Sequence, residues 1–318
     1  MIKGNRHYNV GIMGTGSMAS IMADHIRKIK SIRCIAVSSK SIERAKKFAK
    51  GKRIIHCYGS YEDMLQNEEL DLVYIATRNN DHYYCLKICV ENKIPVLVEK
   101  PFTMSLKETN DIIDYSNSNN CVVFEAMLHY YSEVLNKVKE TLYSGKLGRP
   151  LYFFATLGIP MLTLERVRKV ELGGGASLDL GVYLVALSNE LFGEIESSSI
   201  ERHISVEGVD SSNIYEIYYM NGVRSTLIDS IDCGYENKGI VCCEKGYIII
   251  HDSYNISKAD VYYENTHTTI KRNGDGYFDE LTKVLSYIYS DKVFELSKKQ
   301  MEQTKIIMKV LSDNVRNQ

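Results

Sequence analysis

Two short stretches of the sequence carry side chains that can exchange protons with a ligand. Glu99-Lys100-Pro101 places a carboxylate and an ammonium next to each other in a turn that the proline stiffens. In a loop without context the two charges form a surface ion pair, but beside a charged ligand in a dry cleft the pKa of a lysine can be tuned for proton transfer. Asp179 and Tyr183 are four residues apart in a segment predicted to be helical, which puts both on one face of that helix. Lys100 is therefore a candidate for proton transfer, and Asp179 with Tyr183 is a candidate pair.

A glycine turn near the N-terminus is the element around which such residues would be arranged. The stretch Gly14-Thr15-Gly16-Ser17-Met18-Ala19 follows an apolar strand predicted at Tyr8 to Met13, and it opens a helix predicted from about Ser17 to Lys30. A second strand, Ile32 to Val37, comes after this helix. The glycine pattern alone is a weak signal, but strand, glycine turn, helix and strand in this order predict a dinucleotide-binding unit.

The small residues of this turn have separate physical roles. Gly14 permits a tight turn, Gly16 omits a side chain that would block a pyrophosphate, and Ala19 lets the helix pack on the sheet. The unpaired N–H groups and the positive dipole end of the helix then face the phosphates. We therefore expect the cofactor to contact Gly14, Thr15, Gly16, Ser17 and Met18.

The end of the second strand indicates which dinucleotide is bound. NAD-binding units usually place Asp or Glu about twenty residues beyond the glycines, where it holds the ribose hydroxyls. Here the residues are Ser38, Ser39 and Lys40, whose two hydroxyls and ammonium would bind a 2′-phosphate that a carboxylate would repel. We predict a preference for NADP(H) over NAD(H). The alternative is an ordinary solvated turn in which Ser41 caps the next helix.

Polar residues also follow two further strands of this half of the chain. Ligands bind parallel sheets at the carboxyl ends of the strands, so residues in these places are candidate contacts with the cofactor. The strand Leu72 to Ala76 and the strand Val96 to Val98 are followed by the candidates Thr77, Arg78, Asn79, His82, Glu99 and Lys100.

Residues 1–124 alternate short apolar strands with helical segments, which predicts an α/β Rossmann domain with a parallel, doubly wound sheet. Residues 125–318 have a different pattern and are predicted to form an α+β domain for substrate binding and oligomerisation. Glycines at 173–175 lead into a helix predicted to run to about Leu191, and strands broken by turns such as Asn221-Gly222 and Lys245-Gly246 fill 195–263. We expect a large, open, mostly antiparallel sheet whose apolar face is covered by another subunit.

Composition excludes several classes of function. The net charge is −1 over 318 residues, which favours neither nucleic acid nor an anionic membrane. The first residues lack an apolar signal core, and no apolar run approaches the roughly 18 residues of a membrane span, so we predict a cytoplasmic protein. The eight cysteines form no CxxC pair, and no metal site is expected.

Together these motifs resemble the Gfo/Idh/MocA family of oxidoreductases, which includes glucose–fructose oxidoreductase, inositol dehydrogenase and dimeric dihydrodiol dehydrogenase. The match extends over nearly the whole chain, and the order and spacing of the motifs make it specific although each is weak alone. They comprise the glycine turn, Ser38-Ser39-Lys40, Ser60-Tyr61-Glu62-Asp63, Asp71 to Thr77 with Asn79 and His82, Glu99-Lys100-Pro101, Glu125-Ala126, Gly145 to Gly148, and Gly173 to Tyr183.

The resemblance implies a role for each candidate catalytic residue. The lysine of the family's Glu-Lys-Pro motif is Lys100, and the family's Asp-x-Gly-x-His/Tyr element corresponds to Asp179, Gly181 and Tyr183. The implied acid/base is Tyr183, whose unperturbed pKa of about 10 requires a nearby positive charge that Lys100 could supply. Asp179 would orient the pair or hold a substrate hydroxyl. A homodimer or homotetramer formed through the C-terminal sheet is also implied.

The predicted reaction is reversible hydride transfer between NADP(H) and a hydroxyl-bearing carbon of a sugar, polyol or sugar derivative. The sequence departs from the family pattern at Arg78, where proline is common, and at Tyr130, where an arginine is common. Two alternatives therefore stay open. One is a dehydrogenase of the same fold for a dihydrodiol or another non-sugar carbonyl compound, and the other is a nucleotide-binding redox sensor with little catalytic activity.

Overall fold

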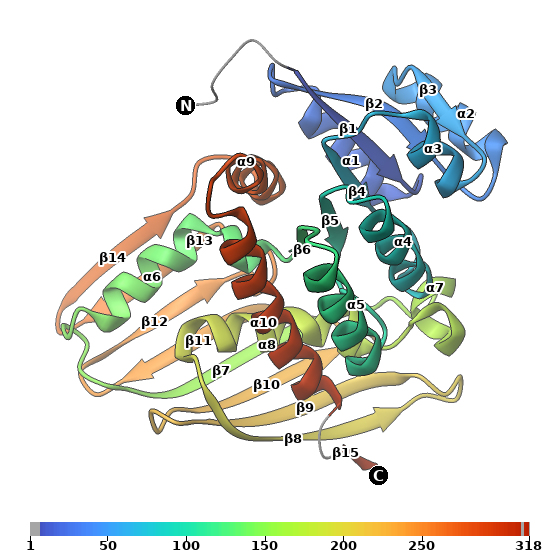
Figure 1. Cartoon of the computed structure of the whole chain (residues 1–318). Coiled ribbons are helices and arrows are strands. Elements are labelled where there is room, and N and C mark those ends of the chain that lie inside the picture. The colour runs from blue at the N-terminus through green and yellow to red at the C-terminus, as the bar shows by residue number, and fades with distance from the viewer. Residues whose placement is uncertain (1–6, 313–314, 318) are drawn as a thin grey trace. The chain divides into compact units, whose positions relative to one another are not determined.

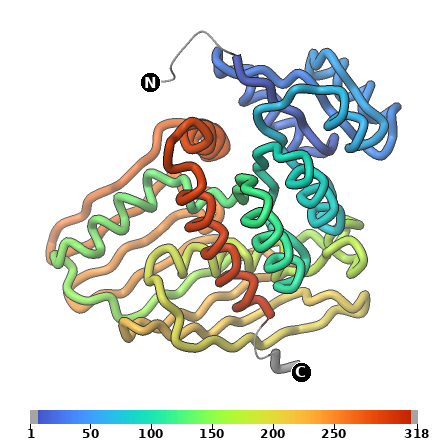
Figure 2. The backbone as a smooth tube through the Cα atoms, in the orientation of Figure 1, coloured from blue at the N-terminus to red at the C-terminus, as the bar shows by residue number. Residues whose placement is uncertain are grey.

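The computed structural model of the chain describes residues 7–312 and 315–317 (Figures 1 and 2). They fold as two compact units. The first unit contains the chain up to Ala126 and also residues 280–304, and the second contains 127–279 and the chain from Lys305 onward. The sequence analysis divides the chain after residue 124 and places all of 280–304 in the second domain. In the structure this stretch is tied to the last strand of the first unit, because the Val123 amide donates to Ser297 Oγ over 3.1 Å.

The described part of the first unit contains a six-stranded parallel sheet in the order β3-β2-β1-β4-β5-β6. The strand order reverses between β1 and β4, which is where open α/β sheets bind ligands. The predicted parallel, doubly wound sheet is therefore confirmed. The strands are β1 (Tyr8–Met13), β2 (Ile32–Ser38), β3 (His56–Tyr58), β4 (Leu72–Ile75), β5 (Val96–Glu99) and β6 (Val123–Ala126).

The helices of this unit follow local sequence signals closely. Ser41, Ser60 and Ser105 each cap a helix by accepting a hydrogen bond from the amide three residues on. The first helix is shorter than predicted and ends at Ile26 instead of Lys30, because the amides of Lys28 and Ile29 bond to carbonyls only three residues back. The helices between the strands are α1 (Ser17–Ile26), α2 (Ile42–Lys52), α3 (Tyr61–Asn67), α4 (Asn79–Glu91) and α5 (Leu106–Ser118).

The second unit is built on a nine-stranded sheet, counting the described residues, in the order β14-β13-β12-β11-β7-β10-β9-β8-β15. Its pairings are antiparallel except β7 with β10 and β8 with β15, which confirms the predicted mostly antiparallel sheet. The strands are β7 (Pro150–Gly158), β8 (Ile195–Ile204), β9 (Asp210–Tyr219), β10 (Arg224–Ser230), β11 (Tyr235–Cys243), β12 (Gly246–His251), β13 (Lys258–Tyr263), β14 (Thr266–Lys271) and β15 (Val315–Asn317).

The helical segment after the glycines differs from the single helix that the sequence predicts. It begins as a π-helix, η3 (Ser177–Gly181), and continues as α8 (Val182–Phe192). Val170–Phe192 is long and apolar enough to cross a membrane, but 72% of its apolar window is buried, as in the core helix of a globular protein. The other helices are η1 (Leu128–Tyr131), α6 (Glu133–Tyr143), α7 (Glu165–Arg168), η2 (Val170–Leu172), α9 (Gly276–Ile288) and α10 (Val293–Ser312).

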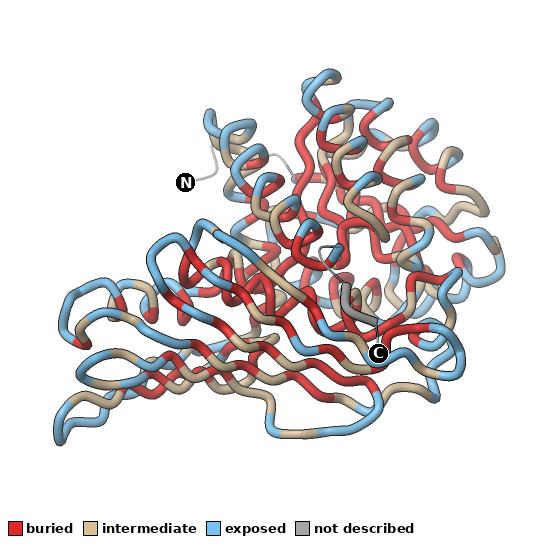
Figure 3. The backbone as a smooth tube through the Cα atoms, turned by 90° about the horizontal axis from the view of Figure 1, so that it is seen from below, coloured by how far each residue is buried: buried red, intermediate tan, exposed pale blue. Residues whose placement is uncertain are grey.

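One face of the second sheet is packed and the other is open. Residues along β9 alternate between buried and accessible, and buried and exposed stretches likewise alternate along the strands in Figure 3. Helix α8 contacts β7 and β10 on the packed face, while α6 contacts β13 and β14. The open face carries Tyr152, Ile214, Tyr218 and Tyr247, which are each 37–41% exposed.

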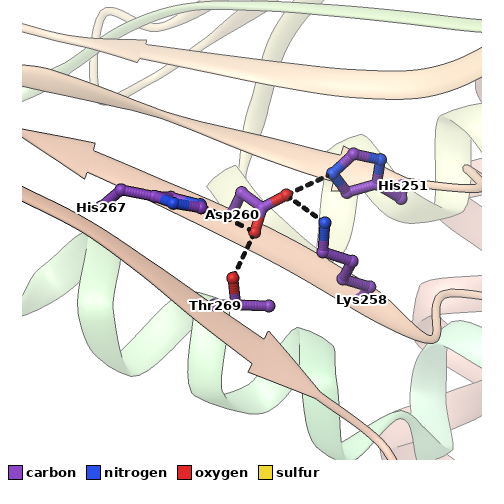
Figure 4. Close-up of polar contacts among 5 residues, drawn as sticks. All are labelled: His251, Lys258, Asp260, His267 and Thr269. Carbon is purple, nitrogen blue, oxygen red and sulfur yellow. Dashed lines mark hydrogen bonds and ion pairs between the residues drawn. The ribbon is translucent and has the colours of Figure 1, made fainter.

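A polar cluster on the open face is centred on Asp260 of β13 (Figure 4). Its carboxylate lies 2.7 Å from His251 Nε2, 2.6 Å from Lys258 Nζ and 3.0 Å from His267 Nε2, and it accepts a hydrogen bond from Thr269 Oγ1 over 2.6 Å. Burial raises the pKa of Asp260, but the four hydrogen bonds, of which the one from Lys258 has the largest effect, together lower it by more. The resulting pKa of Asp260 is well below its usual range. The cluster joins β12, β13 and β14 at the end of the sheet.

Candidate functional site

The two glycines of the turn between β1 and α1 differ in the space around them, because Gly14 is closely packed and Gly16 is not. Gly14 has φ +107°, and a Cβ on it would lie 2.2 Å from the Ala76 carbonyl oxygen, so only glycine fits. A Cβ on Gly16 would meet nothing within 4 Å. Gly16 is the N-cap of α1, and no side chain caps the helix and no acidic residue lies in its first turn. The Gly14 amide donates to the Ser38 carbonyl over 2.9 Å, so the amides that suit a phosphate are those at the start of α1, which no side chain caps.

The residues around this turn are accessible. Thr15 and Met18 are half-buried, and Gly16 and Ser17 are exposed. The donor set and the open space at Gly16 fit the pyrophosphate of a dinucleotide, which Gly14, Thr15, Gly16, Ser17 and Met18 would hold.

At the end of β2 the predicted phosphate-binding residues are engaged in different ways. Ser38 is buried, and its Oγ has no hydrogen-bond partner among the described residues. Ser39 Oγ accepts a 3.4 Å hydrogen bond from the Ser41 amide. Lys40 Nζ lies 2.5 Å from Asp81 Oδ1, an ion pair that the sequence analysis did not predict. The ammonium expected to bind a 2′-phosphate is thus already held by a carboxylate from α4.

The polar residues after β4 surround the start of α4. Arg78 is the exposed N-cap of this helix, and Thr77 and Asn79 are half-buried beside it. His82 is fully buried, and its Nδ1 donates to the Pro101 carbonyl over 2.8 Å. Burial lowers the pKa of His82 to about 4, so the ring is neutral at neutral pH. His82 therefore links α4 to the Glu99-Lys100-Pro101 turn.

That turn leaves β5 with its two charged residues in different environments. Glu99 is buried, and Tyr74 donates its hydroxyl hydrogen bond to the Glu99 carboxylate. Burial raises the pKa of Glu99 despite this hydrogen bond and the nearby charge of Lys100. Lys100 is half-buried and precedes Pro101 through a cis peptide bond. Glu99 is therefore not on the surface, as an ordinary surface ion pair between Glu99 and Lys100 would require.

Two further buried carboxyls belong to the same unit. Glu125 at the end of β6 accepts hydrogen bonds from the Phe102 amide over 3.0 Å and from Thr304 Oγ1 over 2.7 Å, and burial raises its pKa to about 7. Glu280 on α9 is buried, with neither carboxylate oxygen hydrogen-bonded within the described chain. Burial raises the pKa of Glu280, and the charges of Glu99 and Glu125 raise it further. The sequence marks Glu125 by its place after a strand, but no local signal marks Glu280.

In the second unit, Asp179 has a partner that the sequence analysis missed. Arg166 of α7 holds it with two hydrogen bonds, from Nη1 to Oδ1 over 2.9 Å and from Nη2 to Oδ2 over 3.3 Å. Asp179 is buried, whereas the Arg166 side chain is half exposed. Because Asp179 lies in the π-helix and Tyr183 in the α-helix that follows, the expected regular spacing on one α-helical face is not what the structure has.

Aromatic rings surround Tyr183, which is itself buried. The ring of His129 meets it edge-on with centroids 5.8 Å apart, and the ring of Tyr254 lies at 5.7 Å. His129 Nε2 donates to the Ser253 carbonyl over 2.9 Å, and burial lowers the pKa of His129 to about 4. The neutral imidazole of His129 and the phenol ring of Tyr254 therefore form the aromatic environment of the candidate acid/base. Tyr130, which stands where the family often has arginine, has its ring 6.4 Å from that of Tyr131.

The sequence of the first unit matches the family model described as oxidoreductase family, NAD-binding Rossmann fold, over residues 8–127. Residues 135–249 match the GFO/IDH/MocA C-terminal domain. The chain belongs to the Gfo/Idh/MocA family. This Gfo/Idh/MocA protein is therefore an NAD(P)-binding oxidoreductase, and its relatives are dehydrogenases and ketoreductases that act on hydroxyl or carbonyl groups.

Curated relatives of this Gfo/Idh/MocA protein include trans-1,2-dihydrobenzene-1,2-diol dehydrogenases. The enzyme from Xenopus laevis is 26% identical over 273 residues, which cover 83% of each chain. The enzyme from Mus musculus is 27% identical over 240 residues, covering 74% of this chain and 72% of the mouse enzyme.

Solved structures share the fold at lower sequence identity. KijD10, a 3-ketoreductase from Actinomadura kijaniata crystallised with NADP and TDP-benzene, has a TM-score of 0.85 at 17% identity, with 98% of this chain and 99% of KijD10 covered. An NAD-binding oxidoreductase from Klebsiella pneumoniae has a TM-score of 0.84 at 18% identity, covering 96% and 95% of the two chains.

Proposed function

We propose that the protein catalyses reversible, NADP(H)-dependent hydride transfer at a hydroxyl-bearing carbon, with a sugar, polyol or sugar derivative as the first candidate substrate. The observation that carries this proposal is the environment of Tyr183: a buried phenol enclosed by aromatic rings, on the helix that continues the turn where Arg166 holds Asp179. A tyrosine at this position suits proton exchange with a substrate hydroxyl when a positive charge lies nearby, and we propose that Lys100 supplies it.

The chain's own residues would divide the reaction between them. When bound, the nicotinamide supplies or accepts the hydride. During oxidation Tyr183 would act as the phenolate, take the proton of the substrate hydroxyl and become the phenol, and during reduction the phenol would return that proton to the substrate oxygen. The Lys100 ammonium would stabilise the negative charge of the phenolate and of the substrate oxygen. Asp179, fixed by Arg166, holds a neighbouring substrate hydroxyl as a hydrogen-bond acceptor. Lys100 lies in the first unit, and Asp179 and Tyr183 lie in the second.

NADP(H) is the proposed cofactor in preference to NAD(H). Two observations support this choice: β2 ends without a carboxylate of its own, and it is followed by Lys40, whose exposed ammonium is paired with Asp81 of α4. Ser38 Oγ has no hydrogen-bond partner in the described chain, although the residue is fully buried.

A dihydrodiol or another non-sugar carbonyl compound is the second candidate substrate class. The rings of His129 and Tyr254 beside Tyr183 suit a flat, unsaturated ring as well as the apolar face of a sugar. The relatives from Xenopus laevis and Mus musculus, which are trans-1,2-dihydrobenzene-1,2-diol dehydrogenases, also point to this class.

A coupled substrate and variant screen tests the proposal. Purified protein is incubated with NADP⁺ or NAD⁺ and a panel of sugars, inositols, sugar phosphates, nucleotide sugars and aromatic trans-diols, and the absorbance of reduced nicotinamide is followed. We expect turnover with one class, and we expect it to disappear in Tyr183→Phe and Lys100→Met while NADPH still binds. Tyr143→Phe is the matched control, since this tyrosine is exposed and donates to the Leu191 carbonyl on the far end of α8.

Each outcome of the screen decides between the functions considered. Turnover confined to aromatic diols selects the second candidate class. Full activity in Tyr183→Phe contradicts the acid/base assignment. Tight NADPH binding without turnover of any panel member contradicts the proposed substrate classes and favours a redox sensor.

We also propose that the open face of the second sheet joins copies of this chain into a homodimer or homotetramer. The exposed rings of Tyr152, Tyr218 and Tyr247 with Ile214 support this, because soluble proteins seldom leave such a group of large apolar side chains uncovered. Sedimentation of the protein and of Tyr218→Asp tests the assembly, which should dissociate in the variant. The cytoplasmic location stays a prediction, which cell fractionation tests.

A further inference from the structure

A buried polar network lies beneath the π-helix that carries Asp179. It consists of Asp210, Asn213 and Tyr215 on β9 and Asp229 on β10, all of them at most 8% exposed. Asn213 Nδ2 donates to Asp210 Oδ2 over 2.7 Å and to Asp229 Oδ1 over 2.8 Å, and the Tyr215 hydroxyl donates to Asp229 Oδ2 over 2.6 Å. The network thus joins two carboxyl groups that would otherwise repel each other in the core of the sheet.

The same network contacts the π-helix at both of its ends. At the start, the Ser177 amide donates to Asp210 Oδ2 over 2.7 Å. At the end, Gly181 lies so close to the network that a Cβ would be 2.1 Å from the Tyr215 hydroxyl oxygen and 2.4 Å from Asp229 Oδ2. The segment between these two contacts contains Asp179 and leads directly into Tyr183.

A π-helix is a costly conformation that an isolated segment does not keep. Here the sheet supplies what holds it: a carboxylate for the first amide and a close-packed hydroxyl and carboxyl against the glycine. Gly175 has the same relation to the network, because a Cβ on it would lie 2.1 Å from Asp210 Oδ1. The glycines of the segment therefore let its backbone reach the network, which a chain with side chains at 175 and 181 could not do.

We propose that Tyr215 and Asp229 are positioning residues for the reaction: they fix the π-helical turn so that Asp179 and Tyr183 are presented to the substrate in one arrangement. This inference rests on the proposed function, since it assigns the pair that the network positions. Neither residue exchanges a proton with the substrate in this scheme. Burial raises the pKa of Asp229 to about 8, although the hydrogen bonds from Tyr215 and Asn213 oppose this shift.

The test compares two tyrosines of the same strand. Tyr215→Phe removes the hydroxyl that bonds to Asp229, whereas the control, Tyr219→Phe, removes an equally buried hydroxyl that lies 2.6 Å from Ser188 Oγ on α8, beyond the π-helix. For each variant we would measure kcat, KM, the NADPH dissociation constant, and hydrogen exchange of the amides from Ser177 to Tyr183.

In Tyr215→Phe we expect kcat to fall by about tenfold or more, because small misplacement of a reacting group has effects of this size. The NADPH dissociation constant should stay within about twofold, since the glycine turn lies in the first unit, and exchange in 177–183 should accelerate. Tyr219→Phe should change neither kcat nor exchange in this segment. If Tyr215→Phe does not fold, Asp229→Asn takes its place with the same expected results, because it keeps the size of the side chain.

Equal effects of Tyr215→Phe and Tyr219→Phe on kcat and on hydrogen exchange would overturn the inference, because they would show that the network contributes only to the packing of the core. Absence of turnover in the unmodified protein across the substrate panel would instead be a failure of the proposed function. In that case hydrogen exchange decides the inference alone: faster exchange in 177–183 confined to Tyr215→Phe supports it, and unchanged exchange overturns it.

Discussion

If the protein prefers NADP(H), as we propose, the ion pair between Lys40 and Asp81 predicts that a substitution outside the glycine turn changes this preference. Lys40 Nζ lies 2.5 Å from Asp81 Oδ1, with the lysine side chain 57% exposed and the aspartate side chain 17% exposed. A 2′-phosphate that binds Lys40 must compete with Asp81 for the ammonium. Asp81→Asn removes this competitor and keeps the shape of the side chain.

The size of the effect follows from the exposure of the pair. An exposed ion pair is worth about 0.2–1 kcal/mol, so freeing Lys40 should tighten NADPH binding by about 1.4-fold to fivefold. NADH has a hydroxyl in place of the phosphate, and it should bind no better. The complementary variant, Lys40→Met, loses a hydrogen bond between charged groups that is worth about 1.5 kcal/mol at a solvated site, which weakens NADPH binding by about tenfold and leaves NADH binding unchanged.

Titration of both dinucleotides against the quenching of protein fluorescence measures these affinities. The control is Asp24→Asn, which breaks a comparable ion pair between Asp24 and Lys52 with a 2.6 Å contact on α1 and α2. It should alter neither affinity. If Lys40→Met changes the NADPH and NADH dissociation constants by the same factor, Lys40 serves only to pair with Asp81, and the predicted preference for NADP(H) loses its main support.

Three further predictions concern the glycine turn, the Asp179 contact and a buried carboxyl. Gly16→Ala should leave the melting temperature nearly unchanged, because its Cβ meets nothing within 4 Å, yet weaken NADPH binding in calorimetry by about tenfold; unchanged affinity would remove Gly16 from the cofactor site. Arg166→Lys should lower kcat by about tenfold without changing NADPH affinity, because an ammonium cannot make the two hydrogen bonds that hold Asp179; an unaltered kcat would show that Asp179 needs no such fixing. Glu125 has its pKa raised from 4.5 to about 7 by burial, so the folded state keeps a proton that the unfolded state loses, and stability falls as pH rises through this window. Denaturant unfolding should therefore show the stability of Glu125→Gln increasing relative to that of the unmodified protein as pH rises from about 4.5 to 7, by at most roughly 1.4 kcal/mol per pH unit, and a difference independent of pH would contradict the assignment.

The sequence predicts the first unit well because its signals are local. An apolar run of strand length predicts β1 with the bounds that the structure has. The serines before α2 and α3 cap these helices, as their positions in the sequence indicate. Position 14 must be glycine because a Cβ there would collide with the Ala76 carbonyl oxygen. The place of Gly14 directly after β1 is nevertheless evident from the sequence without knowledge of that contact. Periodicity and capping depend on a few adjacent residues, so the packing of distant elements does not change them.

The partners of the site residues could not be predicted in this way. Asp179 is held by Arg166, which lies 13 positions earlier on a separate short helix, and Lys40 is held by Asp81 at a separation of 41. Glu280 joins the first unit from far along the chain. Charges are frequent in any sequence, and which of them meet is decided by the packing of distant elements rather than by local pattern.

The π-helix shows how such distant contacts alter local structure. Helical spacing puts residues four apart on one face, and this reasoning linked Asp179 to Tyr183 in the sequence. The spacing fails at Asp179 because Asp210 on β9 binds the Ser177 amide and the hydroxyl of Tyr215 occupies the space beside Gly181. The conformation of this turn therefore depends both on the sheet below it and on the glycines at 175 and 181, which let its backbone approach that sheet. Variants of β9 and β10 that never contact a substrate should then change turnover while the glycine turn of the first unit, and with it cofactor binding, is untouched.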